Sequence, residues 1–175
     1  MSKSSAKLKK VEVNFGTSLL GVKGSWEADE SEIQAAWELY VELCTRITVA
    51  KLQPGEGLLR EALTSHYNLF NITREILRKH GPSVATPKGK KKDLCFAFLA
   101  VSLLNTVIRP VLAKYHPLLQ DHEAHKHANC SACEHEQKWE HYQELREKLE
   151  EVRKVAIGFA NLLAEVAGVK SLIIE

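Results

Sequence analysis

The sequence predicts a mainly α-helical protein, an antiparallel four-helix bundle with a small N-terminal β-hairpin. Four long segments carry apolar residues three and four positions apart, which is the period of one helix face. One of these segments, Leu94 to Ala113, is apolar on nearly every face, so several neighbouring elements have to bury it. Ahead of the helical segments, Val11, Val13 and Phe15 alternate with polar residues, as they would in a strand.

The composition is that of an ordinary globular protein. With 175 residues, 45% apolar and 26% charged, the chain is long enough for one domain with a sizeable core. We expect residues 1–9 to be a mobile tail and residues 10–175 to form a single helical-bundle domain. The formal net charge of +2 does not indicate nucleic-acid binding. The lysine-rich start has no apolar run behind it, so we predict no signal peptide and a cytoplasmic protein.

The first predicted elements are a hairpin over residues 10–27 and a helix over about 30–52. Two strands alone are marginally stable in water, so Val169 to Ile174 is a candidate for a third strand. Asp29 and Glu32 have the spacing of a capping box at the start of the helix.

The second helix is predicted over residues 56–80 and stops at Gly81-Pro82. His66 lies within one of its apolar rows, where a hydrogen-bonded core histidine is the main interpretation and a ligand-binding histidine the alternative. The linker that follows carries the run Lys88 to Lys92. This run is either a solvated loop or a contact for phosphate or an acidic lipid headgroup.

The third helix is predicted over residues 93–115 and the fourth over 134–168. The apolar part of the third helix covers only about 15 residues before Arg109-Pro110, whereas a bilayer needs about 20, so we favour a buried helix over a membrane anchor. Pro110 should kink it, because proline removes a backbone donor. The fourth helix has the most regular apolar spacing in the chain and ends at Gly168.

The segment between His122 and His135 concentrates residues that bind metals. Thiolate and imidazole are the preferred zinc ligands, and a Cys-x-x-Cys turn can present two sulfurs to one ion. The candidate ligands are Cys130 and Cys133 with two of His125, His127 and His135. The alternative is a histidine-rich surface loop with no cofactor. A catalytic metal is disfavoured, because no carboxylate is placed beside the cluster as a base.

A second candidate site consists of polar residues on helices that otherwise face inward. Asn105 and Arg109 are four positions apart and share one side of the third helix, while Glu42 and Arg46 share one side of the first. A buried Arg109 needs a partner, and a glutamate of the first helix could supply it. Such a network either fixes the helix register or holds a small anionic ligand between helices. We find no catalytic constellation and therefore predict no enzyme.

Several stretches are similar to a family of small helical accessory proteins of filamentous actinobacteria. These stretches are Trp37 to Leu43, Leu58 to Leu63, Leu104-Asn105 with Arg109 to Leu112, Tyr115 to Pro117, and Ala164 to Val169. The similarity covers most of the chain from Trp26 onward and implies a cytoplasmic accessory protein of a defence or signalling system, with no activity for any residue. The Lys88 to Lys92 run and the Cys/His loop depart from the family, so a metal site is not implied for the family as a whole.

The function we expect is therefore a non-catalytic interaction or sensing module that binds a protein partner or a second copy of itself. One alternative is a zinc-binding protein that works through the His122 to His135 loop. A second alternative is a peripheral membrane protein that uses the lysine-rich linker.

Overall fold

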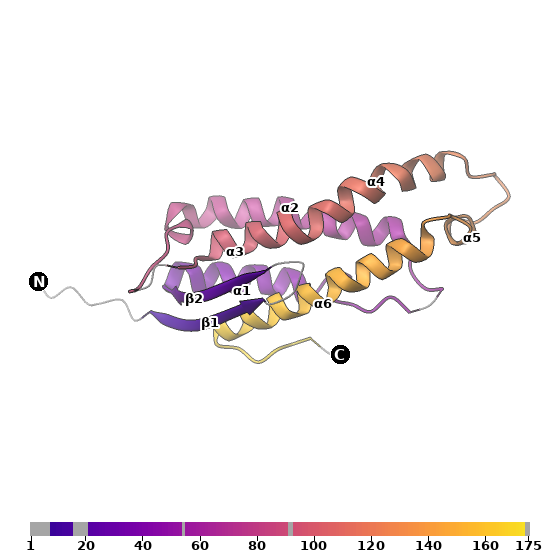
Figure 1. Ribbon diagram of the computed structural model, residues 1–175. Coiled ribbons are helices and arrows are strands. Elements are labelled where there is room, and N and C mark those ends of the chain that lie inside the picture. The colour runs from indigo at the N-terminus through magenta and orange to yellow at the C-terminus, as the bar shows by residue number, and fades with distance from the viewer. Residues whose placement is uncertain (1–7, 16–20, 54, 91–92, 174–175) are drawn as a thin grey trace, which may run out of the picture.

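The computed structural model describes residues 8–15, 21–53, 55–90 and 93–173. The fold is mainly helical with an antiparallel two-stranded hairpin at the N-terminus, as the sequence predicts. The elements are β1 (Lys9–Phe15), β2 (Val22–Ala28), α1 (Glu30–Cys44), α2 (Leu59–His80), a short 3-10 turn (Gly81–Ala85), α3 (Phe96–Ser102), the π-helical turn η2 (Leu103–Ile108), α4 (Arg109–Ala124), α5 (Ala132–Gln137) and α6 (Tyr142–Ala167). The long helices lie side by side, with the hairpin at one end and α5 at the other (Figure 1).

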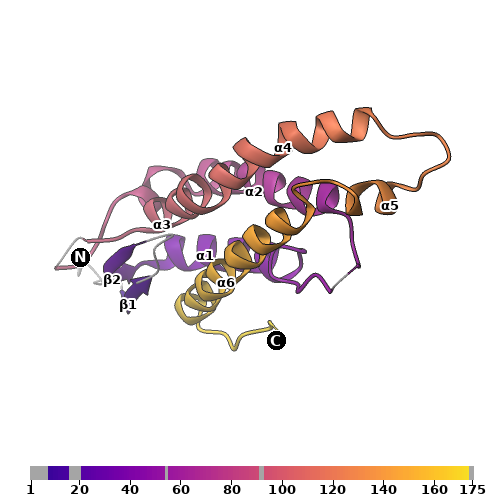
Figure 2. The ribbon, with the colours of Figure 1, turned by 45° about the vertical axis from the view of Figure 1, so that its right-hand side comes forward.

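The hairpin packs on α6 through the apolar side of β1. Val11 and Val13 are buried, and Val11 pairs with Trp26 of β2. The predicted third strand is wrong over residues 169–173, which contain no strand; the chain turns back after α6 (Figure 2), and Ser171 donates a hydrogen bond of 2.8 Å to Asn161. Support for β2 comes instead from Leu94, which forms a parallel bridge with Trp26.

Helix α1 begins as predicted and ends earlier than predicted. The Asp29 carboxylate accepts from the Glu32 N–H at 3.1 Å and the Glu32 carboxylate accepts from the Asp29 N–H at 3.4 Å, which completes the capping box. The helix ends at Cys44, well before residue 52. Residues 45–49 are mostly β-branched, which lowers helix propensity, and they form tight turns in place of a helix.

The third helix is longer than predicted. Helices α3 and α4 join through η2 into one continuous helix from Phe96 to Ala124, so the expected end near residue 115 is wrong. In η2 the hydrogen bonds are one residue longer than in an α-helix, and the Arg109 N–H donates to the Leu104 carbonyl. This change of register directly precedes Pro110, which has no N–H to donate, so the helix continues past this proline.

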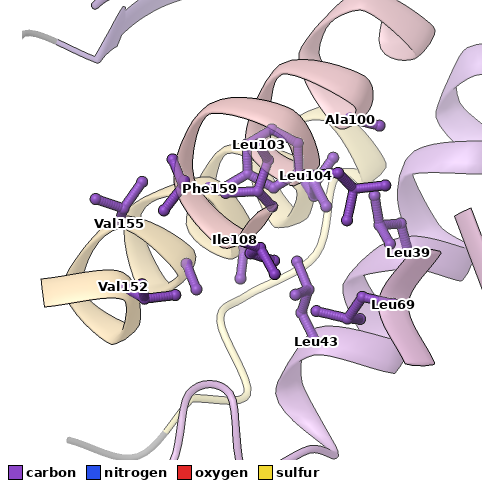
Figure 3. Packing of buried hydrophobic residues seen from close by; sticks show 14 of the residues in the cluster. Leu39, Leu43, Leu69, Ala100, Leu103, Leu104, Ile108, Val152, Val155 and Phe159 are labelled. Atoms are coloured by element: carbon purple, nitrogen blue, oxygen red, sulfur yellow. The ribbon is translucent and has the colours of Figure 1, made fainter. Parts of the chain in front are cut away.

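The η2 turn lies at the centre of the core. Leu103, Leu104 and Ile108 project between α1 and α6, where they meet residues such as Leu43 and Phe159 (Figure 3). The buried cluster includes residues from β1 through α6, so the apolar third helix has the central place that the sequence predicts.

The length of the continuous third helix differs from the length that we expected from the sequence, and this bears on whether it could span a membrane. The continuous helix Phe96–Ala124 has 29 residues, so the expectation that it is too short to span a bilayer is wrong. Among the described residues it is the one helix long and apolar enough to do so, and the core helix of a soluble protein meets the same criteria. Of the most apolar 18-residue stretch of this helix, 44% is buried inside the protein.

The predicted fourth helix divides into α5 and α6. Residues 138–141 form tight turns, in which the Trp139 N–H donates to the Glu136 carbonyl and the Tyr142 N–H to the Trp139 carbonyl, both at 3.0 Å. Trp139 is buried and the Glu136 side chain contacts α2, so tertiary contacts hold this break in place. Gly168 ends α6 in the left-handed conformation, with φ of 75°, which glycine adopts readily at the end of a helix.

Candidate functional site

Helices α2 and α4 border a surface groove of about 510 Å³. Its lining residues are Tyr67, Phe70, Arg74, Arg109, Leu112, Ala113 and His116; we call it the α2/α4 groove. Its floor is aromatic and aliphatic, its charged residues are two arginines, and the lining contains no carboxylate. The Tyr67 side chain is 52% exposed, so a large aromatic surface is open to a ligand.

Arg109 is the residue of the predicted ligand site that lies in this groove. Its Nε donates to the Asn105 side-chain oxygen at 3.0 Å, and its guanidinium lies 4.9 Å from the centre of the Phe70 ring. Asn105 and Arg109 therefore share one side of the helix, as predicted. Arg109 is exposed, however, so the expectation of a buried arginine paired with a glutamate of the first helix is wrong.

Glu42 and Arg46 lie elsewhere. Glu42 of α1 forms an ion pair of 2.7 Å with Arg46, which lies in the turns after this helix, and Glu42 also lines a second groove, of about 480 Å³, between α1 and α2. In this second groove α2 presents Ile72 and Ile76, whereas it presents Phe70 and other residues to the α2/α4 groove. Because α2 separates the two grooves, the predicted residues do not form one site.

Three charged residues of the second groove, Glu38, Glu42 and Lys79, are already ion-paired. Glu38 accepts hydrogen bonds from Lys79 and, at 3.1 Å, from His80. Burial alone would raise the pKa of Glu38, but these two donors lower it below its usual 4.5. Trp37 also lines this groove and is 38% exposed.

The two arginines of the α2/α4 groove have neutral polar partners, so their positive charges could still bind an anion. Arg74 donates to the Asn71 side-chain oxygen at 2.7 Å, and Arg109 has the Asn105 amide as its polar partner. Within the described ranges neither guanidinium has a carboxylate in ion-pair distance, whereas Arg60 binds Glu123 at 2.8 Å. The groove therefore combines uncompensated positive charge with exposed aromatic surface, a combination that suits an anionic ligand with an apolar part.

The Cys/His loop is held closed by a histidine pair. The His122 and His135 rings stack 3.9 Å apart, and each Nε2 lies within 2.9 Å of the other residue's backbone oxygen. His125 bonds to the Asp121 carbonyl at 2.8 Å. His135 and His125 each therefore have one ring nitrogen engaged by the backbone.

The two cysteines have polar neighbours of their own. The Cys130 sulfur lies 3.9 Å from a Glu134 oxygen, and the Cys133 sulfur accepts from Gln137 at 3.3 Å. The structure does not bring Cys130, Cys133, His125, His127 and His135 together. Among all the residues it describes, no group of three or more His, Cys, Asp or Glu side chains is placed to hold a metal ion. Zinc binding would require this loop to rearrange, and it stays a prediction.

Two buried carboxylates have roles that the sequence does not reveal. Glu136 of α5 accepts from the backbone N–H groups of Leu59 at 2.8 Å and Arg60 at 3.1 Å, and so caps the start of α2, where Leu58 has no capping side chain. Glu32 accepts from the Trp26 indole and from the backbone N–H of Phe96, the first residue of α3. The sequence predicts only the contact of Glu32 with its neighbour Asp29, the capping box.

The lysine-rich linker is partly a structural element. Lys88 Nζ lies 3.0 Å from the Glu32 carboxylate and 3.2 Å from that of Asp29. Gly89 has φ of 77°, and a side chain there would meet the Glu27 carboxylate. Lys91 and Lys92 lie outside the described residues. Lys88 therefore binds carboxylates of its own chain, and an anionic ligand would have to displace them.

Comparisons with protein-family models, curated proteins and solved structures find no match to this chain.

Proposed function

We propose that this protein is a non-catalytic interaction module, built as an antiparallel four-helix bundle, that binds an acidic amphipathic segment of a protein partner in the α2/α4 groove. The observation that carries the proposal is the pair of arginines, Arg74 and Arg109, which flank the aromatic floor without a carboxylate partner among the described residues. An acidic partner would supply the missing charges, and its apolar residues would cover the exposed ring of Tyr67.

The shape of the site favours a helix as the occupant. The groove runs between two helices, and apolar side chains spaced three and four apart on a partner helix fit such a groove. The exposed strip continues along the same side of the third helix, where Phe98 and Val101 are 51% and 38% exposed and precede Asn105 and Arg109 at helical spacing. An elongated segment therefore matches the surface better than a compact ligand does.

A designed peptide tests the proposal. The probe is a fluorescein-labelled amphipathic helix of about 18 residues with Leu and Phe on one face and Glu on the other, and its binding is measured by fluorescence anisotropy. The comparison peptide carries Lys in place of every Glu. We expect saturable binding of the acidic peptide only, which weakens with added salt because exposed charges are screened.

Arginine variants locate the binding site. Each exposed ion pair contributes little, so we expect Arg74→Gln/Arg109→Gln to weaken binding about tenfold. Arg78→Gln is the matched control, since Arg78 is also exposed on α2 but does not line the groove. Equal binding of both peptides, or no difference between the double variant and the control, would contradict the proposal. A mass that rises with concentration and returns to the monomer value in the double variant would identify a second copy as the occupant and overturn the acidic-partner assignment.

A further inference from the structure

A row of hydrogen-bond donors borders one side of the α2/α4 groove. Tyr67, Phe70 and Arg74 are three and four positions apart, so they share one side of α2. The Tyr67 and Phe70 rings are 6.5 Å apart, and the Arg109 guanidinium lies 4.9 Å from the centre of the Phe70 ring. Side chains four positions apart on a helix are neighbours, so the Arg109 guanidinium covers the position one helical turn before Arg74. A phenol and two guanidinium groups therefore follow one another along the groove.

Each arginine keeps one edge of its guanidinium free for a ligand. Arg109 uses Nε for its bond to Asn105, and its Nη1 and Nη2 atoms have no hydrogen-bond partner among the described residues. Arg74 uses Nη1 for its bond to Asn71, and within the same part of the chain its Nε and Nη2 atoms have no partner either. Paired N–H donors on one edge of a guanidinium match two oxygens of one anion. The groove therefore offers two such edges.

A phosphate monoester matches these two edges better than a single carboxylate does. A carboxylate has two oxygens and can satisfy one edge, whereas a phosphorylated side chain has three acceptor oxygens and can bind both. Its charge of about −1.5 to −2 at neutral pH also matches two arginines whose polar partners are neutral amides. The Tyr67 hydroxyl, on a side chain that is 52% exposed, is a further donor.

We infer that the partner segment bound in the α2/α4 groove carries a phosphorylated side chain, whose phosphate binds Arg74 and Arg109 together. The inference rests on the proposed function, since it names the group by which the same site recognises its partner. The exposed apolar strip through Phe98 and Val101 favours a phosphopeptide over a free phosphate ion, which has no apolar part to cover it. Phosphorylation of the partner therefore strengthens its binding to this protein.

Three versions of the labelled amphipathic peptide test the inference by fluorescence anisotropy. One position beside the apolar face carries glutamate, phosphoserine or serine, and the rest of the peptide is unchanged. We expect the phosphoserine peptide to bind about tenfold tighter than the glutamate peptide, because its phosphate fills both guanidinium edges. The serine peptide should bind weakest, and phosphatase treatment should return the phosphoserine peptide to that affinity.

Lysine variants separate the guanidinium edges from the positive charge. Arg74→Lys/Arg109→Lys keeps both charges and removes both pairs of fixed donors. We expect this variant to bind the glutamate peptide as the parent does and to lose most of the preference for phosphoserine. Arg78→Lys is the matched control, since Arg78 is exposed on α2 outside the groove lining, and it should keep the preference.

The outcomes separate this inference from the proposed function. A phosphoserine preference that is lost in Arg74→Lys/Arg109→Lys and kept in Arg78→Lys supports the inference. Equal affinity for the glutamate and phosphoserine peptides, or a preference that persists in the double variant, overturns it and leaves the acidic-segment proposal standing. No binding of any peptide overturns both. Phosphoinositide vesicles that bind the parent and not the double variant, without a phosphoserine preference, would assign the arginines to a lipid headgroup and also overturn the inference.

Discussion

Replacing Glu32 should destabilise the fold more than replacing any other glutamate of α1, because its side chain joins three parts of the chain. Its Oε1 accepts from the Trp26 indole of β2 at 3.0 Å and from the Phe96 N–H at 2.9 Å. Its Oε2 accepts from Lys88 at 3.0 Å and from the Asp29 N–H at 3.4 Å. The side chain is completely buried, so the donors that it binds have no contact with bulk water.

The magnitude follows from the donors that are left behind. In Glu32→Ala the buried N–H groups of Trp26 and Phe96 lose their acceptor, and each unsatisfied donor costs about 1–3 kcal/mol. We therefore expect the free energy of unfolding to fall by about 2–6 kcal/mol, a large part of the 5–15 kcal/mol typical of a domain. Lys88 keeps Asp29 as a partner at 3.2 Å, so it adds less than an isolated buried charge would.

A conservative variant separates charge from hydrogen bonding. In Glu32→Gln the amide oxygen can still accept from Trp26 and Phe96, but the amide N–H₂ then faces the Lys88 ammonium, which is also a donor. Adding Lys88→Met removes that conflict, so the double variant should recover part of the stability lost in Glu32→Gln. A coupling energy of about 1 kcal/mol between the two sites would be the signature of this contact.

Urea unfolding followed by far-UV circular dichroism measures these differences, since the midpoint shifts with the free energy of unfolding. The control is Glu30→Ala, an exposed glutamate in the same first turn of α1, which should change stability by less than about 0.5 kcal/mol. If Glu32→Ala loses no more stability than Glu30→Ala, the buried carboxylate does not join these segments and the reasoning fails.

The remaining predictions concern the end of the molecule that carries α5. Glu136→Ala should leave the buried N–H of Leu59 without an acceptor and lower the free energy of unfolding by about 1–3 kcal/mol. It should also speed amide hydrogen exchange in the first turn of α2. The control Ser131→Ala, which removes only the cap of α5, should leave that exchange unchanged. Because the described residues form no metal cluster, purified tag-free protein should retain far less than one zinc per chain after dialysis. Near-stoichiometric zinc that disappears in Cys130→Ser/Cys133→Ser would show instead that the loop rearranges around the metal.

Local patterns were sufficient to predict several elements. The alternation from Val11 to Phe15 indicates a strand, the Asp29 capping box begins α1 and Gly168 ends α6, because each of these signals acts between residues close in sequence. The same holds for Asn105 and Arg109, which share one side of a helix because they are four positions apart. Their exposure could not be predicted, because it depends on which side of the third helix the other helices cover.

The boundaries that the sequence could not predict are those set by contacts between distant segments. The third helix passes Pro110 because the π-helical turn places Leu103, Leu104 and Ile108 in the core, and this packing stabilises a register that local propensity disfavours. The predicted fourth helix breaks after α5, where the Glu136 side chain turns to cap the start of α2.

By itself, the sequence determined the helical class, the hairpin and most helix positions, since propensity and apolar spacing act over a few residues. Only the tertiary structure decided which polar side chains meet. It placed Glu32 beside Phe96 and put α2 between Glu42 and Arg109. It also buried His66, which confirms that this histidine is a hydrogen-bonded core residue. Hydrogen bonds between residues far apart in sequence leave no periodic signal, because their geometry exists only after the helices have packed.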